Sequence, residues 1–148
     1  MIPLNLPPFE YKVKKAEGKL WIFDVIRKKY VALIPEEWVR QHFIHWIVDH
    51  LNYPKSLIRV EGGLTFNQLA KRTDIVVFDR NGKPWMIIEC KSPDIPVSEK
   101  TVFQASTYNA IHKAKYITVT NGITHLYAGT AWEEGTTRWL EKMPDFGD

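Results

Sequence analysis

The sequence has little that would place the protein outside the cell or in a membrane. Its 148 residues include a single cysteine, Cys90, so an internal disulfide framework is excluded. Residues 1–12, MIPLNLPPFEYK, lack the basic stretch followed by an apolar stretch that marks a secretion signal. No apolar run approaches the roughly 18 to 20 residues that are needed to span a bilayer. We therefore expect a cytoplasmic protein with no membrane partner.

The composition carries no strong bias either. Hydrophobic residues make up 45% and charged residues 25% of the chain, as in an ordinary globular domain. The net charge of +3 is compatible with a polyanionic partner but does not require one. We expect one domain over residues 1–148, with an N-terminal edge hairpin at about 9–34, a core at about 35–128 and a C-terminal tail at 129–148.

The most informative stretch is residues 72–91, RTDIVVFDRNGKPWMIIECK. It predicts two strands, at 74–79 and 84–90, joined by a tight turn at Asn81-Gly82. Because side chains alternate along a strand, Glu89 and Lys91 should share one face while Cys90 enters the core on the other. A carboxylate such as Glu89 at the end of an apolar run costs several kcal/mol of desolvation unless it is paired or bound to a metal.

The segments around this hairpin predict an ordered series of helices and strands. A helix should begin at Pro35, end by residues 52–54 and bury one apolar face. A second helix should begin after Ser98, a good N-cap residue, and run to about residue 112. The remaining elements are strands at 56–61, 116–120 and 124–128, a turn at 121–122, and one helical turn within 137–143. This order is typical of an α/β or α+β domain with a central mixed sheet flanked by helices.

The charged residues of the hairpin form a candidate cation site. Asp74 opens the first strand, and Glu89 and Lys91 close the second. Carboxylate oxygens are the ligands that Mg²⁺ prefers, and a bound metal can lower the pKa of a water and neutralise a phosphate. Lys91 could orient or deprotonate that water or stabilise the transition state. The simpler alternative is that Glu89 and Lys91 form a structural ion pair near a sheet edge.

The second predicted helix adds two polar side chains. Gln104 and Tyr108 stand four residues apart and therefore lie close to each other on a helix surface. Phe103, Ala110 and Ala114 are predicted to form the core stripe beside them. An amide and a phenol suit contacts with phosphate, although a packed tyrosine with a hydrogen-bonded glutamine would look the same in the sequence.

These motifs together resemble the PD-(D/E)xK nuclease superfamily. The Glu89-Cys90-Lys91 motif after Asp74, followed by Gln104-x-x-x-Tyr108, is similar to its RecB-like branch. The chain also resembles the N-terminal family of type I restriction enzyme R subunits over residues 8–146. The segments that carry this likeness are PEEWVRQHF, VEGG, KRTDIVVFDRNGKP, IIECKSP and VTNG.

The resemblance implies a restriction-endonuclease-like core with the order helix-strand-strand-strand-helix-strand. It implies metal binding by Asp74 and Glu89, with water activation or transition-state stabilisation by Lys91. It makes Gln104 and Tyr108 supporting active-site residues. The implied cofactor is Mg²⁺, with Mn²⁺ as an alternative.

Two further acids are candidates for the site. Glu37 matches a first-helix acid that completes the metal site in some members, and an acid that interacts with the helix dipole is the alternative. Glu61 precedes Gly62-Gly63, where a role in loop geometry is the favoured interpretation.

The function implied by the resemblance is a metal-dependent endonuclease that hydrolyses DNA phosphodiester bonds in restriction, defence or repair. A non-catalytic DNA-binding or assembly module that retains the nuclease fold is the alternative, and a purely structural domain is a third. The chain has no Gly-x-x-x-x-Gly-Lys-Ser/Thr phosphate loop, so we expect a stand-alone domain without the helicase that follows in R subunits. Candidate partners are DNA, a second copy in a homodimer, and separate helicase or specificity subunits.

Overall fold

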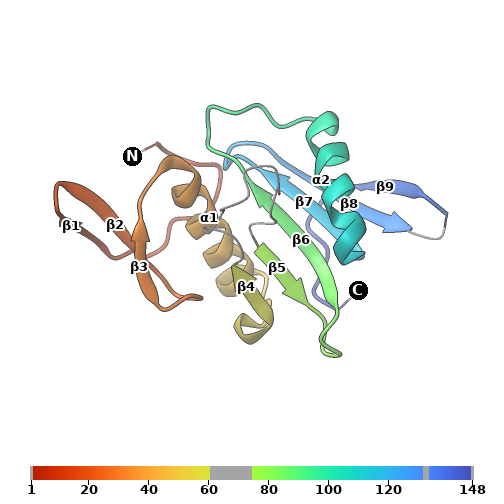
Figure 1. Cartoon of the computed structure of the whole chain (residues 1–148), viewed down its shortest axis with the longest axis horizontal. Helices are drawn as coiled ribbons and strands as arrows, with labels where there is room; N and C mark the ends of the chain where they lie inside the picture. The colour runs from red at the N-terminus through yellow and green to blue at the C-terminus, as the bar shows by residue number, and fades with distance from the viewer. Residues whose placement is uncertain (1, 61–74, 132–133, 148) are drawn as a thin grey trace.

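The protein is a mixed α/β structure with two separate sheets. The computed structural model describes residues 2–60, 75–131 and 134–147, and for residues 108–112 the backbone alone. A three-stranded sheet of order β1-β2-β3 precedes a six-stranded sheet of order β4-β5-β6-β7-β8-β9. Helix α1 lies between the small sheet and the large one, and α2 lies over β6 to β8 (Figure 1).

The small sheet and the first helices come before the large sheet in the chain. Their bounds are β1 Val13–Ala16, β2 Lys19–Asp24, β3 Lys29–Ala32, α1 Pro35–His45, a π-helical continuation Trp46–His50, and a short 3-10 helix Lys55–Leu57. The remaining elements are β4 Ile58–Val60, β5 Ile75–Phe78, β6 Pro84–Cys90, α2 Glu99–His112, β7 Tyr116–Thr120, β8 His125–Ala131 and β9 Thr136–Leu140.

The large sheet is mixed, as the sequence predicts. β4, β5 and β6 pair antiparallel, β6 and β7 pair parallel, and β7, β8 and β9 pair antiparallel. A parallel pair cannot be joined by a tight turn, so the chain crosses over between β6 and β7, and α2 forms this crossover. The predicted chain order from the first helix through the fifth strand is confirmed.

The turn between β5 and β6 lies where it was predicted, but its geometry differs. Gly82 has a φ of 80°, whereas Asn81 does not adopt a positive φ. The Asp79 side chain accepts hydrogen bonds from the backbone N–H groups of Asn81 at 2.8 Å and Lys83 at 2.9 Å. A backbone hydrogen bond of 2.8 Å from Asp79 to Lys83 closes a loop of three residues. The glycine therefore supplies the single left-handed residue that such loops require.

Two apolar cores cover the two faces of the large sheet. The α1 core contains Val39, Phe43 and Ile47, all at 0% exposure, and it includes Cys90 from β6. The α2 core contains Ile87 of β6, three residues before Cys90 and therefore on the opposite face. Strand β6 is thus covered on both faces, as its apolar run predicts.

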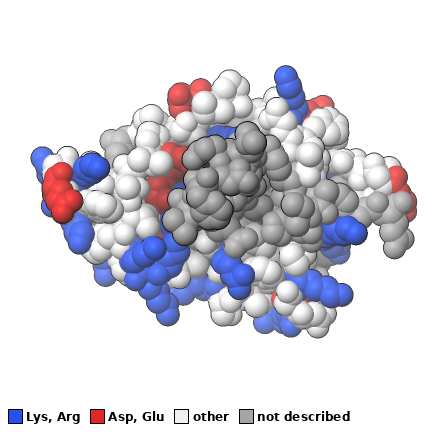
Figure 2. Space-filling model, viewed as in Figure 1, with Lys and Arg blue, Asp and Glu red and all other residues white. Residues whose placement is uncertain are grey.

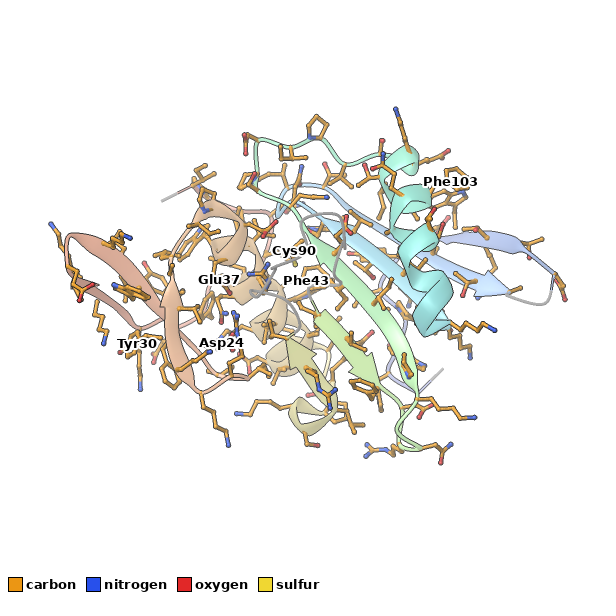
Figure 3. All side chains as sticks on the ribbon, viewed as in Figure 1. Asp24, Tyr30, Glu37, Phe43, Cys90 and Phe103 are labelled. Carbon is orange, nitrogen blue, oxygen red and sulfur yellow. The ribbon has the colours of Figure 1, made fainter. Side chains whose placement is uncertain are left out.

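The predicted core stripe of the second helix is confirmed at Ala114, which is 0% exposed in the α2 core, and is wrong at Phe103, while the side chain of Ala110 lies outside the described residues. Val102 and Ala105 are 1% exposed and pack in the α2 core, whereas Phe103 is 56% exposed. Phe103 instead meets Trp139 of β9 edge-on, with ring centroids 6.5 Å apart (Figure 3). The Phe103 ring therefore covers part of the end strand of the sheet and does not enter the core.

The prediction of a helical turn within 137–143 is also wrong. Residues Thr136 to Leu140 form β9, which pairs antiparallel with β8. Two consecutive threonines favour a strand because β-branched side chains lose freedom in a helix. The sheet therefore extends past residue 128, where the C-terminal tail was predicted to begin. In the N-terminal region, β3 adds a third strand to the predicted hairpin.

Candidate active site

Strand β6 ends at the two charged residues that the sequence singles out. Cys90 pairs with Thr120 of the parallel neighbour β7. The Lys91 backbone N–H then donates a 2.8 Å hydrogen bond to the Thr120 carbonyl oxygen. The ladder therefore continues one residue beyond β6 and fixes the backbone from which the Lys91 side chain departs.

Glu89 and Lys91 contact each other on one face of the sheet. The Lys91 Nζ lies 3.0 Å from the Glu89 Oε2, and their side chains are 20% and 10% exposed. Cys90 is 1% exposed on the opposite face, in the α1 core. The predicted alternation is confirmed, and it places a largely buried carboxylate beside a cation that still reaches solvent.

Glu37, the other predicted metal ligand among the residues that the structure describes, lies in an ion-pair network near the small sheet. Its Oε1 accepts a hydrogen bond from Arg40 at 2.5 Å. Its Oε2 accepts hydrogen bonds from Arg27 at 2.9 Å and from Gln41 at 2.8 Å. Arg40 also contacts the half-buried Glu36 at 3.1 Å. The Glu37 carboxylate therefore accepts three hydrogen bonds, whereas the Glu89 carboxylate contacts one cation.

Asp24, at the end of β2, anchors Arg27 in this network (Figure 3). Its Oδ1 accepts the backbone N–H groups of Ile26 at 2.7 Å and Arg27 at 3.0 Å, and its Oδ2 contacts the Arg27 Nε at 2.5 Å. Burial by itself raises the pKa of Asp24, but the hydrogen bonds and charge of Arg27 and the Ile26 N–H outweigh it and lower that pKa. Asp24 is therefore held as a carboxylate, and Arg27 bridges it to Glu37.

Gln41 completes the network from inside the protein. It is 0% exposed, and its Nε2 donates to Glu37. Within the described residues, its Oε1 is buried without a hydrogen-bond partner. We name Asp24, Arg27, Glu37, Arg40 and Gln41 the Arg-Glu cluster.

The other predicted site residues are described in part or not at all. Asp74 and Glu61 lie outside the described residues, as does the side chain of Tyr108. Gln104 is exposed on α2, and among the described contacts none joins it to Lys91. No group of three acids, histidines or cysteines that could hold a metal occurs within residues 2–60, 75–131 and 134–147.

Most of the Arg-Glu cluster was not predicted from the sequence. Arg27 was considered within the basic run Arg27-Lys28-Lys29, for which a solvated charge run and a phosphate-contacting patch were the alternatives. The local signal was present, because Asp24 stands three residues before Arg27, the spacing of a side chain that caps its own turn. The contact from Arg27 to α1 spans ten residues and could not be read from local spacing.

Comparison with known proteins gives the family. No curated protein matches the chain. A solved fragment of a putative HsdR subunit of a type I restriction enzyme from Vibrio vulnificus matches with 25% identity and a TM-score of 0.40, over 59% of this chain and 16% of that one. None of the described helices is long and apolar enough to cross a membrane. Residues 35–144 match the family model of the type I restriction enzyme R protein N terminus, and the chain therefore belongs to that family.

Proposed function

We propose that the protein is a metal-dependent endonuclease that hydrolyses DNA phosphodiester bonds, as part of restriction, defence or repair. The observation that carries this proposal is the contact of 3.0 Å between the buried Glu89 carboxylate and the Lys91 ammonium. A carboxylate and an amine held together at a strand end supply a metal ligand and a proton donor or acceptor at one place. The family membership of residues 35–144 supports the proposal.

The described pairing of β5 and β6 supports a place for Asp74 in the same site. Ile75 of β5 pairs with Ile88 of β6. Asp74 immediately precedes Ile75 in the sequence, and Glu89 immediately follows Ile88. The chain neighbours of the two acids are thus cross-strand partners, and we propose that both acids act together in a restriction-endonuclease-like core.

The chemistry of Glu89 fits a hard divalent cation. Its Oε2 contacts Lys91, and within the described residues its Oε1 has no partner, so one oxygen is left to bind a ligand. Asp74 and Glu89 would hold Mg²⁺ or Mn²⁺. Glu37 would join them as a further ligand only by giving up one of the hydrogen bonds that it accepts from Arg27, Arg40 and Gln41. A bound metal would lower the pKa of a water molecule and neutralise charge on the scissile phosphate.

Lys91 has a role that does not depend on the metal. Because its backbone is tied to Thr120 and its Nζ is held beside Glu89, its position is fixed before a substrate binds. An ammonium in a partly buried site can donate to a phosphate oxygen and stabilise the negative charge of the transition state. Gln104 and Tyr108 are proposed as supporting contacts to the phosphate backbone.

A second candidate function is a non-catalytic DNA-binding or assembly module that keeps the nuclease fold. The observation that favours it is that Lys91 lies close enough to balance the charge of the buried Glu89 carboxylate, as a purely structural ion pair would. Under either function, the proposed partners are DNA, a second copy of the chain, and separate helicase or specificity subunits.

Cleavage of supercoiled plasmid separates these two functions. The purified protein is incubated with plasmid and Mg²⁺ or Mn²⁺, and in parallel with EDTA. We expect metal-dependent nicking or linearisation, and we expect Asp74→Ala, Glu89→Gln and Lys91→Ala each to lower the rate at least ~100-fold, a typical loss for one electrostatic group.

Matched variants control for unspecific effects of the substitutions. Glu99→Gln and Lys83→Ala change exposed residues of the same types. We expect both to cleave like the unchanged protein. Cleavage that survives in Glu89→Gln and Lys91→Ala, or that never appears with any substrate, would favour the non-catalytic module.

A further inference from the structure

The excess of positive over negative charge in the protein arises in its first 34 residues. Seven of the 20 Lys and Arg residues but three of the 17 Asp and Glu residues lie there, which gives a net charge of +4 for residues 1–34 and −1 for residues 35–148. The family match begins at residue 35, so this charge lies outside the matched region. The small sheet β1-β2-β3 forms most of this N-terminal region.

One face of the small sheet collects exposed lysines. Lys14 pairs with Trp21, and Lys19 and Trp21 are two residues apart in β2, so these three side chains share a face. Ile22 alternates to the other face and is 0% exposed, so that face is turned toward the rest of the protein. At the end of the molecule where Figure 1 places β1 to β3, Figure 2 shows several Lys and Arg side chains around one acidic patch.

Aromatic rings on the same face contact Lys14 and a further lysine, Lys12. The Lys14 Nζ lies 4.3 Å from the ring centroid of Tyr30, and the Lys12 Nζ lies 5.7 Å from that of Phe23. Phe23 and Tyr30 in turn contact each other, with centroids 5.4 Å apart. Cation–π contacts keep each ammonium over its ring without neutralising its charge, so both remain available to an anion.

We infer that this face of the small sheet, which we name the lysine–aromatic face (Lys12, Lys14, Lys19, Trp21, Phe23 and Tyr30), binds the phosphate backbone of DNA. The inference rests on the proposed function and deepens it, because it names the surface that holds the substrate of that site. Lysines whose ammonium groups stay charged are suited to phosphates and read no base sequence.

The charge distribution favours this role over general solubility. A solubilising surface would mix both signs, as the rest of the chain does with its net charge of −1. The six side chains that define the lysine–aromatic face instead include three lysines and no acid, on an antiparallel sheet. It would raise the local concentration of DNA near the cleavage site whatever the sequence of that DNA.

The test measures binding to a short labelled DNA duplex by fluorescence anisotropy, in EDTA so that no cleavage occurs. One variant combines Lys12→Glu, Lys14→Glu and Lys19→Glu. Its matched control combines Lys83→Glu, Lys113→Glu and Lys142→Glu, three exposed lysines outside the small sheet. Both variants have the same net charge, so a difference in their DNA affinity reports only where the substituted lysines lie. Thermal unfolding of each variant shows whether it is folded.

We expect the N-terminal variant to bind at least ~10-fold more weakly than the control, with a salt dependence (log K against log salt) shallower by roughly 2 to 3, as for three lost phosphate contacts. Equal binding by the two variants would overturn the inference. Equally strong binding of poly-glutamate, lost in the same proportion in the N-terminal variant, would assign the face to acidic polymers in general and would also overturn it.

The DNA-binding test and the plasmid-cleavage test can fail independently of each other. If plasmid is cleaved but the two variants bind DNA equally, the nuclease assignment stands and the lysine–aromatic face is not its DNA-binding surface. If plasmid is never cleaved but the N-terminal variant alone loses DNA, the face binds DNA in a protein that does not cut it.

Discussion

Two buried glutamates of this protein, both predicted as metal ligands, lie in different surroundings. Glu37 of α1 accepts hydrogen bonds from Arg27, Arg40 and Gln41. Glu89 of β6 contacts Lys91. The first carboxylate is surrounded by donors that neutralise it, whereas the second contacts a single lysine among the residues that the structure describes. The comparison teaches that two glutamates chosen by the same resemblance can differ in their surroundings, and only the surroundings of Glu89 fit the proposed chemistry without the loss of existing hydrogen bonds.

The charged partners of the two glutamates also come from different parts of the chain. Lys91 is two residues from Glu89, on the same strand end. Arg27 reaches Glu37 from the small sheet, which precedes the family match at residue 35. Glu37 thus connects the N-terminal region to the core, and we expect its substitution to lower mainly the stability of the protein.

The largest expected effect is therefore on the folding stability of a Glu37→Gln variant. Removing this charge leaves Arg27 and Arg40 without their shared partner, and breaking a buried ion pair costs about 3 to 5 kcal/mol. Urea unfolding followed by circular dichroism measures the loss. Glu36→Gln is the matched control, because its side chain is 41% exposed and it pairs with the same Arg40. We expect a loss below about 1 kcal/mol there, and equal losses in the two variants would contradict the distinction.

A smaller effect is expected for the coupling between Glu89 and Lys91. A double-mutant cycle with Glu89→Gln, Lys91→Met and the double variant isolates it from the unfolding free energies. Because the Lys91 side chain is 20% exposed, we expect about 1 kcal/mol of coupling. No measurable coupling would mean that the contact does not hold Lys91 in place.

How much of this could be predicted from the sequence depends on how local the signal is. The β5–β6 hairpin, β7 and the start of α1 at Pro35 follow from turn residues, apolar runs and a helix-initiating proline, all within a few residues. β9 was misread because its strand partner, β8, is needed to identify it. Phe103 was misplaced because the sequence alone does not show which side of α2 meets Trp139.

In the candidate site, too, the features with a local sequence signal could be predicted and the contacts between distant segments could not. The shared face of Glu89 and Lys91 follows from strand alternation and is confirmed by their contact. Of the partners of Glu37, Arg40 and Gln41 stand at local helical spacings, but the contact with Arg27 could not be predicted because Arg27 lies in the turn between β2 and β3. The roles of Asp74, Gln104 and Tyr108 remain predictions from the resemblance.

The smallest expected effect concerns a neutral contact between the N-terminal segment and the large sheet. The His125 Nε2 lies 3.0 Å from the Asn5 carbonyl oxygen, and its Nδ1 lies 2.6 Å from the Thr120 hydroxyl. These partners fit a neutral ring that donates from Nε2 and accepts at Nδ1. Burial lowers the pKa of His125, although the hydrogen bond to Asn5 opposes the shift, and burial likewise lowers the pKa of His42.

The lowered pKa of His125 determines how the stability of the protein changes with pH. Below the ordinary histidine pKa of about 6.5, the unfolded chain gains protons that the folded protein resists. The stabilisation is therefore complete above about pH 6.5 and is lost as the pH falls through the lowered folded-state pKa. We expect the melting temperature to decrease from pH 7.5 toward about pH 5, and less steeply in His125→Gln. An equally steep decrease in that variant would show that His125 does not contribute.

The most direct test of the central claim is the affinity of the protein for Mn²⁺, measured by isothermal titration calorimetry without DNA. If Glu89 is a ligand of the metal that the proposed nuclease uses, Glu89→Gln should weaken Mn²⁺ binding at least ~10-fold, about 1.4 kcal/mol, whereas the exposed control Glu99→Gln should bind like the unchanged protein. Equal Mn²⁺ affinity in the unchanged protein and in Glu89→Gln would contradict the claim and leave Glu89 as the partner of Lys91 alone.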